Sequence, residues 1–283
     1  MNEKALVLMY YGFPETTAEM TDYLKDILRG RQPPQSLVDE NIRKLNLIGG
    51  KTPSTAIVKK IGEKLRDRMT SEGFNVYLLT KHYKPSLKDA RGMIKEEDVY
   101  EAPLFPIYSK QIFDEYFLTL ENALGKRHFH RITNIGFSTG LIEYYKQRIG
   151  EQKKLLVFSA HSIPIRGYDP YPSLISSASR MIAGDREYIN IYHSQGPFAK
   201  SWLGPYPDYC ISYARRRGFN EVILSPIGFL YEHIEILYDL DWDLKHKMES
   251  NGLKYSRIPS PNDDDAVIDA IADSIGGESF PAS

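Results

Sequence analysis

Cysteine is almost absent from this sequence: Cys210 is the single thiol among 283 residues. One thiol excludes an internal disulfide framework, and it excludes any zinc or iron–sulfur site that needs several cysteine ligands. A metal ion handled by these residues must therefore meet imidazoles and carboxylates. We expect no iron–sulfur cluster and no other prosthetic group.

An excess of one charge is also missing, because 36 Lys and Arg residues face 37 Asp and Glu residues. That balance does not support a nucleic-acid partner or an anionic membrane partner. The longest apolar stretch near the N-terminus, Ala5–Tyr11, is too short to cross a bilayer, and it follows Glu3 and Lys4 rather than a secretion signal. We expect a cytoplasmic protein without an integral membrane segment, and we favour a monomer.

Several common catalytic motifs are absent as well. No HExxH, G-x-G-x-x-G or Walker A string occurs, which removes the usual signatures of zinc proteases and nucleotide-binding proteins. His233 and Glu235 form an H-x-E pair, but the zinc deaminase signature also needs a later P-C-x-x-C. One cysteine cannot supply that second element.

The sequence contains short apolar runs that alternate with segments of helical hydrophobic period. This pattern is typical of α/β units with parallel strands. The second half repeats the first, since Leu155–Ala160 matches Ala5–Tyr10, and Pro164 follows its run as Pro14 follows the earlier one. The repeat predicts two similar lobes.

We predict an N-terminal α/β lobe over 1–125, a C-terminal α/β lobe over 126–259, and a final helix over 260–276 that packs back on the first lobe. The ends of parallel strands from both lobes would then surround a shared cleft, where such folds bind ligands. Further strands are expected at 76–80, 102–107, 188–192 and 222–229, and helices at 20–28 and 54–69.

One histidine stands where such a cleft would lie. His161 ends a predicted strand and is flanked by small residues. An imidazole there is well placed for proton transfer or for contact with a metal ion. The alternative is a histidine that only bonds the backbone of its own turn.

An acidic row is the second candidate. On a helix, Glu235, Asp239 and Asp243 would fall at i, i+4 and i+8, within one stripe. Repulsion between like charges at this spacing destabilises a helix by about 0.2–0.5 kcal/mol per pair. The row therefore indicates either a solvated acidic face or a line of oxygen ligands that passes a dication along the helix.

Aromatic residues follow several predicted strands, among them Tyr11, Tyr108 and Trp202. Such residues most often pack in cores and turns. At strand ends they could also cover a flat aromatic ligand by stacking.

Short motifs follow one another in a fixed order over nearly the whole chain, from Ala5 to Ile275. They are Tyr11-Gly12-Phe13-Pro14, Arg29-Gly30-Arg31, Ile48-Gly49-Gly50 with Pro53, Lys81-His82, Ser159-Ala160-His161-Ser162-Ile163-Pro164, Ser194-Gln195-Gly196, Trp202-Leu203-Gly204-Pro205, and Pro226-Ile227-Gly228-Phe229 leading to His233-Ile234-Glu235. In this order they resemble the ferrochelatase family, and most of all its short coproporphyrin-type bacterial members.

The resemblance implies two Rossmann-like lobes, each with a four-stranded parallel sheet, and a porphyrin cleft between them. It implies insertion of ferrous iron into a porphyrin in heme biosynthesis, with release of two pyrrole protons. His161 would be the imidazole that accepts a proton or meets the metal, and Glu235 would be its partner carboxylate. Which of the two does which job is left open by the resemblance.

The resemblance also implies roles for other residues. Asp239 and Asp243 would be metal ligands beyond Glu235, and His82 would face that row as a further metal ligand. The substrate-binding residues would be Tyr11 over the macrocycle, Arg29 and Arg31 near its carboxylates, and Tyr108, Ser194 and Trp202.

Three departures from the family are visible. The segment Phe105-Pro106-Ile107-Tyr108-Ser109 lacks the histidine that many members carry after their third strand, and the chain lacks the cysteine extension that holds an iron–sulfur cluster in some. No long apolar run lies between Pro34 and Gly49, where charged and polar residues interrupt the apolar ones, so no membrane-binding lip is expected.

Two alternatives to a ferrochelatase fit the same residues. One is a cobalt chelatase that acts on a reduced tetrapyrrole, and the other is a non-catalytic tetrapyrrole or heme carrier. Within the leading hypothesis the substrates are a porphyrin and ferrous iron, and the porphyrin is either protoporphyrin IX or coproporphyrin III.

Overall fold

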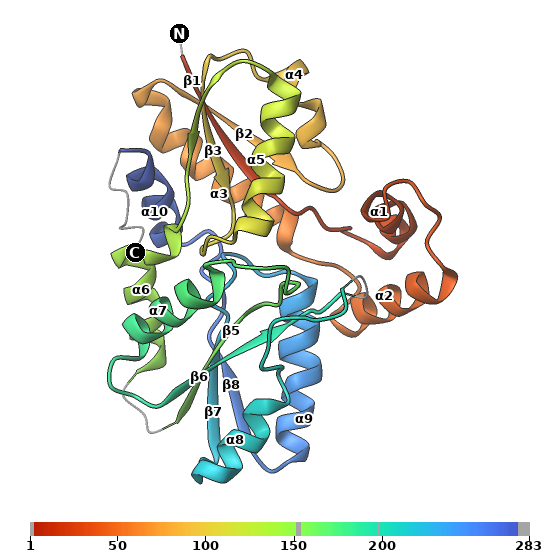
Figure 1. The fold of residues 1–283 in the computed structure, drawn as a ribbon, viewed down its shortest axis with the longest axis vertical. Coiled ribbons are helices and arrows are strands. Elements are labelled where there is room, and N and C mark those ends of the chain that lie inside the picture. The colour runs from red at the N-terminus through yellow and green to blue at the C-terminus, as the bar shows by residue number, and fades with distance from the viewer. Residues whose placement is uncertain (1–2, 151–153, 197–198, 277–283) are drawn as a thin grey trace.

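Two four-stranded parallel sheets, one in each half of the chain, form the frame of the molecule (Figure 1). The computed structural model describes residues 3–150, 154–196 and 199–276. The first sheet has the order β2-β1-β3-β4 and the second β6-β5-β7-β8, so the predicted repeat and fold class are confirmed. The strands are β1 Lys4–Tyr10, β2 Phe74–Thr80, β3 Asp98–Pro103, β4 His128–Arg131, β5 Leu155–His161, β6 Tyr188–His193, β7 Glu221–Ser225 and β8 Lys254–Arg257.

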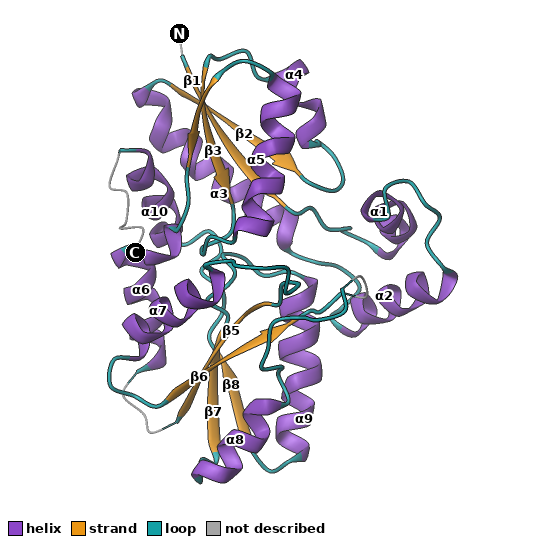
Figure 2. Cartoon of the chain, viewed as in Figure 1, coloured by secondary structure: helices purple, strands orange, loops and turns teal. Residues whose placement is uncertain are grey.

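Helices cover the sheets (Figure 2). The longer ones are α1 Met20–Ile27, α2 Gln35–Leu47, α3 Ser54–Met69, α4 Ala90–Met93, α5 Lys110–Leu124, α6 Thr139–Ile149, α7 Tyr171–Ala183, α8 Tyr209–Arg217, a π-helix η5 Ile236–Leu244 that continues into α9 Lys245–Ser250, and α10 Asp265–Ile275. Short 3₁₀ turns are η1 Thr17–Glu19, η2 Thr70–Glu72, η3 Leu87–Asp89 and η4 Ile135–Phe137.

The strands β1 and β5 are the second strand of their sheets and are almost wholly buried. Their near-continuous apolar sequences suit parallel strands that are covered on both faces, which explains why they were predictable. Two predicted strands end earlier than expected. β7 ends before Pro226, because proline has no N–H to donate to the sheet. β3 spans Asp98–Pro103 and thus lies four residues before the predicted range of 102–107.

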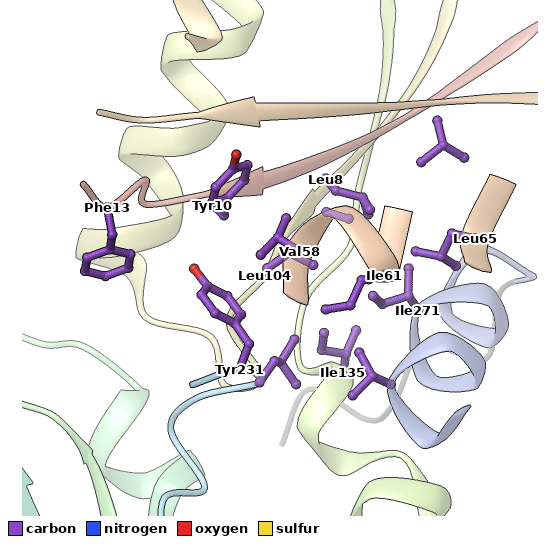
Figure 3. Packing of buried hydrophobic residues seen from close by; sticks show 14 of the residues in the cluster. Leu8, Tyr10, Phe13, Val58, Ile61, Leu65, Leu104, Ile135, Tyr231 and Ile271 are labelled. Carbon is purple, nitrogen blue, oxygen red and sulfur yellow. The ribbon is translucent and has the colours of Figure 1, made fainter. Parts of the chain in front are cut away.

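One hydrophobic cluster joins the two halves of the chain. Leu230 and Tyr231, which follow β7, pack in the same core as Tyr10 and Phe13 (Figure 3). Ile271 of α10 lies in that core with α3 as well. The segment that leads to Glu235 is therefore held by the core of the N-terminal half.

Gly12 is required where the chain leaves β1. Its φ of +83° lies in the left-handed region, and an added Cβ would stand 1.8 Å from the carbonyl oxygen of His82. The close approach is fixed by a hydrogen bond from the His82 N–H to the Tyr11 carbonyl oxygen, with N and O 2.8 Å apart. This contact sets the spacing between Tyr11 and His82.

We expect Gly12→Ala to lower the free energy of unfolding more than Gly73→Ala does. Both glycines have the same left-handed backbone, but a Cβ at Gly73 meets nothing within 4 Å. Gly73→Ala should cost about 1–2 kcal/mol for the backbone alone, and Gly12→Ala should cost about 1–3 kcal/mol more for the clash. Urea denaturation measures both values, and equal losses would contradict the assigned close approach.

Candidate active site

Two adjoining cavities lie where the strand ends of both halves meet. The larger has a volume of about 790 Å³ and a mixed lining of apolar and charged side chains, and it lies between α1 and α2 on one side and η5 on the other; we name it the polar cavity after the carboxylates in its wall. The smaller is mostly apolar, has a volume of about 210 Å³ and is lined by His161 and Trp202. Tyr11, Phe13 and Glu235 line both cavities, so they form the boundary between them.

His161 is the last residue of β5, and its side chain lines the apolar cavity. Its Nδ1 is in hydrogen-bond contact with the carbonyl oxygen of Ser162. Because a carbonyl oxygen only accepts, Nδ1 must carry a proton, and the neutral ring has its lone pair on Nε2. That Nε2 is 3.6 Å from Glu235 Oε1, which is an ion-pair distance but too long for a hydrogen bond.

Glu235 lies in the first turn of the helix that begins at Ile234. Burial acts to raise the pKa of its carboxyl group, but the neighbouring imidazoles, above all His161, outweigh burial and lower that pKa to about 2. The positive end of the helix dipole favours the same charge. In turn, burial acts to lower the pKa of His161, but Glu235 outweighs it and the pKa is raised. The two groups therefore stabilise each other's charged forms.

His233 lies on the other side of the same carboxylate. Its ring is buried and stacks on Phe13 at 4.9 Å between centroids, and its Nδ1 accepts the backbone N–H of Glu235 at 3.3 Å. Burial lowers its pKa to about 4, so this imidazole is neutral at neutral pH. It holds the Glu235 backbone in place, and the sequence analysis assigned it no role.

The acidic row lies on one wall of the polar cavity. Glu235, Asp239 and Asp243 all line that cavity, and Asp243 pairs with Lys247 at 2.9 Å. The helix itself differs from an ordinary α-helix, because residues 236–244 form a π-helix. The apolar pattern of this segment does not distinguish the two helix types, which explains why the π-helix was not predicted. Such segments are frequent at functional sites.

His193 is a site residue that the sequence analysis missed. It ends β6 directly opposite His161 in the sheet register, and its ring lines the polar cavity. Its neighbour Ser194, which was predicted, has a φ of +60° and donates its hydroxyl hydrogen to Asp239 Oδ2. The equivalent positions of His161 and His193 at the ends of paired strands are the signal that could have identified it.

Tyr11 and His82 are in ring contact beside the cavities. Tyr11 stands between Phe13 and His82, with ring centroids 5.5 Å and 4.9 Å away. His82 lines neither cavity, and its Nδ1 is 2.8 Å from Asp26 Oδ2 on α1. The hydrogen bond between the Tyr11 and His82 backbones explains this position. A metal-binding role for His82 stays a prediction.

Of the remaining predicted substrate residues, some line a cavity and others do not. Trp202 lines the apolar cavity, whereas Tyr108 packs edge-on against Phe113 and lines neither cavity. Arg29 and Arg31 are exposed just beyond α1, where their neighbour Leu28 lines the polar cavity. Their roles with substrate are untested by this geometry.

Ser138 belongs to a G-x-S-x-G string, Gly136–Gly140, that resembles a hydrolase motif. The structure gives it a structural role. Ser138 is the N-cap of α6, and its hydroxyl oxygen accepts the N–H of Leu141 at 3.2 Å. This serine is therefore a helix cap rather than a nucleophile.

In 3–150, 154–196 and 199–276, no group of three or more His, Cys, Asp or Glu side chains is arranged to hold a metal ion. Over the same ranges, no helix combines the length and the apolar character needed to cross a bilayer.

Sequence comparisons extend the resemblance to named proteins. A family model described as Ferrochelatase matches residues 3–278. A ferrochelatase from Thermoplasma acidophilum is 30% identical over 281 residues, which cover 95% of this chain and 89% of that protein. A coproporphyrin III ferrochelatase from a Geobacillus species is 29% identical over 294 residues, which cover 94% and 95% respectively.

Solved structures match the same architecture. SirB from Bacillus subtilis with Fe³⁺ has a TM-score of 0.57 and 12% sequence identity, over 99% of this chain and all of that one. CbiX, the terminal enzyme of siroheme biosynthesis in denitrifying bacteria, has a TM-score of 0.56 and 16% identity, over 98% of this chain and all of that one. At these identities the likeness is one of fold.

We expect Glu235→Gln to lower the pKa of His161. The substitution removes the charge that raises this pKa and leaves burial, which lowers it. Asp239→Asn should lower it less, because Asp239 contributes less than Glu235. NMR titration of the His161 ring protons in wild type and both variants checks this order, and an unchanged pKa in Glu235→Gln would contradict the pairing.

The same pair predicts a pH window for stability. A histidine whose pKa is raised in the folded protein stabilises the fold fully at pH values below 6.5, its ordinary pKa. That stabilisation is lost as the pH rises through the raised pKa. A carboxyl group whose pKa is lowered in the folded protein stabilises the fold fully at pH values above 4.5, its ordinary pKa. That stabilisation is lost as the pH falls toward the lowered pKa of about 2. The stability difference between wild type and Glu235→Gln should therefore be largest between pH 4.5 and 6.5.

Proposed function

The chain belongs to the ferrochelatase family, and we propose that His161 and Glu235 form the centre at which it inserts ferrous iron into a porphyrin. Enzymes of this family are metal–porphyrin chelatases of heme biosynthesis. One observation carries the proposal for the centre: an imidazole and a carboxylate lie 3.6 Å apart where an apolar cavity meets a polar one.

The two cavities suit the two substrates. The apolar cavity, with Trp202 and Phe105 in its wall, suits one part of the flat macrocycle; because its volume of about 210 Å³ is smaller than a whole porphyrin, the rest of the ring must occupy the larger cavity. The carboxylates in the wall of the larger cavity suit a hydrated dication. Tyr11 and Phe13 separate the cavities beside Glu235. Bound in this way, the central nitrogens of the porphyrin would meet the iron at the His161–Glu235 pair.

His161 is the proton acceptor of the pair in this proposal. Its neutral ring keeps the Nε2 lone pair free, because Nδ1 donates to the Ser162 carbonyl. A carboxyl group with a pKa of about 2 is a weaker base, so Glu235 instead stabilises the imidazolium and contacts the iron. Each insertion releases two pyrrole protons: His161 takes the first on Nε2 and gives it to water in the adjoining polar cavity, and it then takes the second.

Asp243 and Asp239 deliver the ion to Glu235. Carboxylates are ligands from which a dication exchanges readily, and the three lie in order along one wall of the polar cavity. Lys247 pairs with Asp243 and Asp208 at the far end of the row. The lysine limits the negative charge where the ion enters.

We further propose coproporphyrin III as the preferred porphyrin. Several similar proteins, among them the one from a Geobacillus species, are named coproporphyrin III ferrochelatases. Arg29 and Arg31 form no ion pair within the described parts of the chain, and they lie beside a residue of the cavity wall. Free guanidinium groups suit the additional carboxylates of that porphyrin.

We also propose that the protein works as a monomer in the cytoplasm without a prosthetic group. The single thiol supports the last point, because Cys210 is buried and its Sγ contacts the carbonyl oxygen of Pro207. It is thus not available as a cluster ligand.

Anaerobic Fe²⁺ insertion, followed by absorbance with protoporphyrin IX and coproporphyrin III side by side, tests this function. Wild type should metallate coproporphyrin III faster, and His161→Ala should lose about 10²–10⁴-fold in rate with either porphyrin, because it lacks the base. His128→Ala, on the exposed edge strand β4, is the control and should match wild type. Near-wild-type metallation by His161→Ala would remove this centre from the proposal.

Asp239→Asn/Asp243→Asn should raise the KM for Fe²⁺ by on the order of tenfold and leave the KM for porphyrin within about twofold. The change removes two carboxylate charges from the iron route but keeps the size of both side chains. Glu249→Gln is the matched control, because it removes an exposed carboxylate from α9, which continues the helix of the acidic row. A parallel loss of porphyrin affinity would argue against a delivery role.

A further inference from the structure

His193 has one ring nitrogen without a partner. The residue is 1% exposed, and its Nε2 is buried and makes no hydrogen bond within the residues that the structure describes. Buried polar atoms are nearly always paired, so an unpaired nitrogen on a residue that lines a functional cavity calls for an explanation. The family resemblance assigned no role to this side chain.

A chain of hydrogen bonds defines which nitrogen is free. Ser194 donates its one hydroxyl hydrogen to Asp239 Oδ2, so its oxygen can only accept from His193 Nδ1, which is 2.8 Å away. Nδ1 therefore carries the ring proton, and the lone pair of the neutral ring is on Nε2. Histidines that bind metals typically have this arrangement, with the second nitrogen donating to an oxygen that orients the ring.

His193 adjoins both the acidic row and the catalytic pair, because its Nδ1 is 3.4 Å from Asp239 Oδ2 and it is paired with His161 in the strand register. Through Ser194 it is joined to Asp239, which is one of the carboxylates of η5. Its ring also lies against Phe229 at 5.3 Å, and the rings of His161 and His233 contact the same phenyl ring at 6.4 Å and 4.7 Å. Three imidazoles thus surround one aromatic side chain beside Glu235.

We propose that His193 is an additional iron ligand, which takes Fe²⁺ through Nε2 on its way from Asp239 to the His161–Glu235 pair. The proposal rests on the proposed function and adds a nitrogen donor to a route otherwise made of carboxylates. Each transfer forms one coordinate bond as another breaks, and the iron remains ferrous throughout. Ser194, which is anchored to Asp239, acts as the positioning residue for the imidazole.

The nitrogen donor has a chemical consequence. Carboxylates alone suit Mg²⁺ and Ca²⁺ as well as iron, whereas imidazole favours borderline ions such as Fe²⁺ and Co²⁺. A histidine after the row therefore discriminates against Mg²⁺ before the ion reaches the porphyrin. His193 is in this sense a residue that determines metal specificity.

Titration of the porphyrin-free protein with Co²⁺ tests the proposal directly. The Co²⁺ absorption bands give the affinity, and high-spin Co²⁺ shifts the exchangeable N–H signal of each coordinated imidazole far from the rest of the proton NMR spectrum. His193→Gln should weaken Co²⁺ binding by about 10–100-fold and remove one such signal. In turnover it should raise the KM for Fe²⁺, leave the KM for porphyrin unchanged, and increase inhibition by Mg²⁺.

Two further variants keep the result interpretable. His246→Gln removes an exposed imidazole from α9, the continuation of the helix that carries the acidic row. It should change neither the Co²⁺ affinity nor the number of shifted N–H signals. Ser194→Ala keeps the imidazole but removes its anchor, and should weaken Co²⁺ binding by about tenfold even if His193→Gln folds poorly. Unchanged Co²⁺ affinity and signal count in His193→Gln, or in Ser194→Ala where only that variant folds, would overturn the proposal.

Failure of the proposed function has a different signature. If wild type binds porphyrin but inserts no iron, the function itself falls whatever the Co²⁺ titration gives. If His161→Ala stops insertion while His193→Gln binds Co²⁺ and inserts iron like wild type, only the role of His193 falls.

Discussion

The geometry of the active site depends on how one short segment packs between the two halves of the chain. Leu230, Tyr231 and Ile234 lie in the core of the N-terminal half, although they follow a strand of the other sheet. Glu235 comes next, so its distance from His161 is fixed by hydrophobic packing rather than by the pair itself. Burial of three large apolar side chains is worth several times more than an ion pair of this length.

A buried guanidinium strengthens the same arrangement from the opposite side. Arg257 makes two hydrogen bonds to Asp241 of the π-helix, at 2.5 Å and 2.6 Å, and a third to Glu232 at 2.7 Å. It thus joins the helix that carries the acidic row to the segment that precedes Glu235. Asp241 is the acidic residue of this helix that the predicted row left out, and its contact with Arg257 explains why it faces away from the cavity.

The sequence predicted what local patterns determine. The buried strands β1 and β5 are continuous apolar runs, and the spacing of Glu235, Asp239 and Asp243 holds on the cavity wall. The prediction missed α2, although Val38, Ile42 and Leu45 of that helix follow a helical period and pack in the core of the N-terminal half. His193 and the position of His82 follow from strand register and from a backbone contact, which no local pattern reveals.

The shared core also reverses the order in which the two halves can be completed during synthesis. The N-terminal sheet emerges first, but its core takes in Tyr231 and, from α10, Val267 and Ile271. The clusters of the C-terminal half need nothing beyond Ile258. The half that is made first therefore finishes last, and its apolar surface stays uncovered until the last helix has left the ribosome.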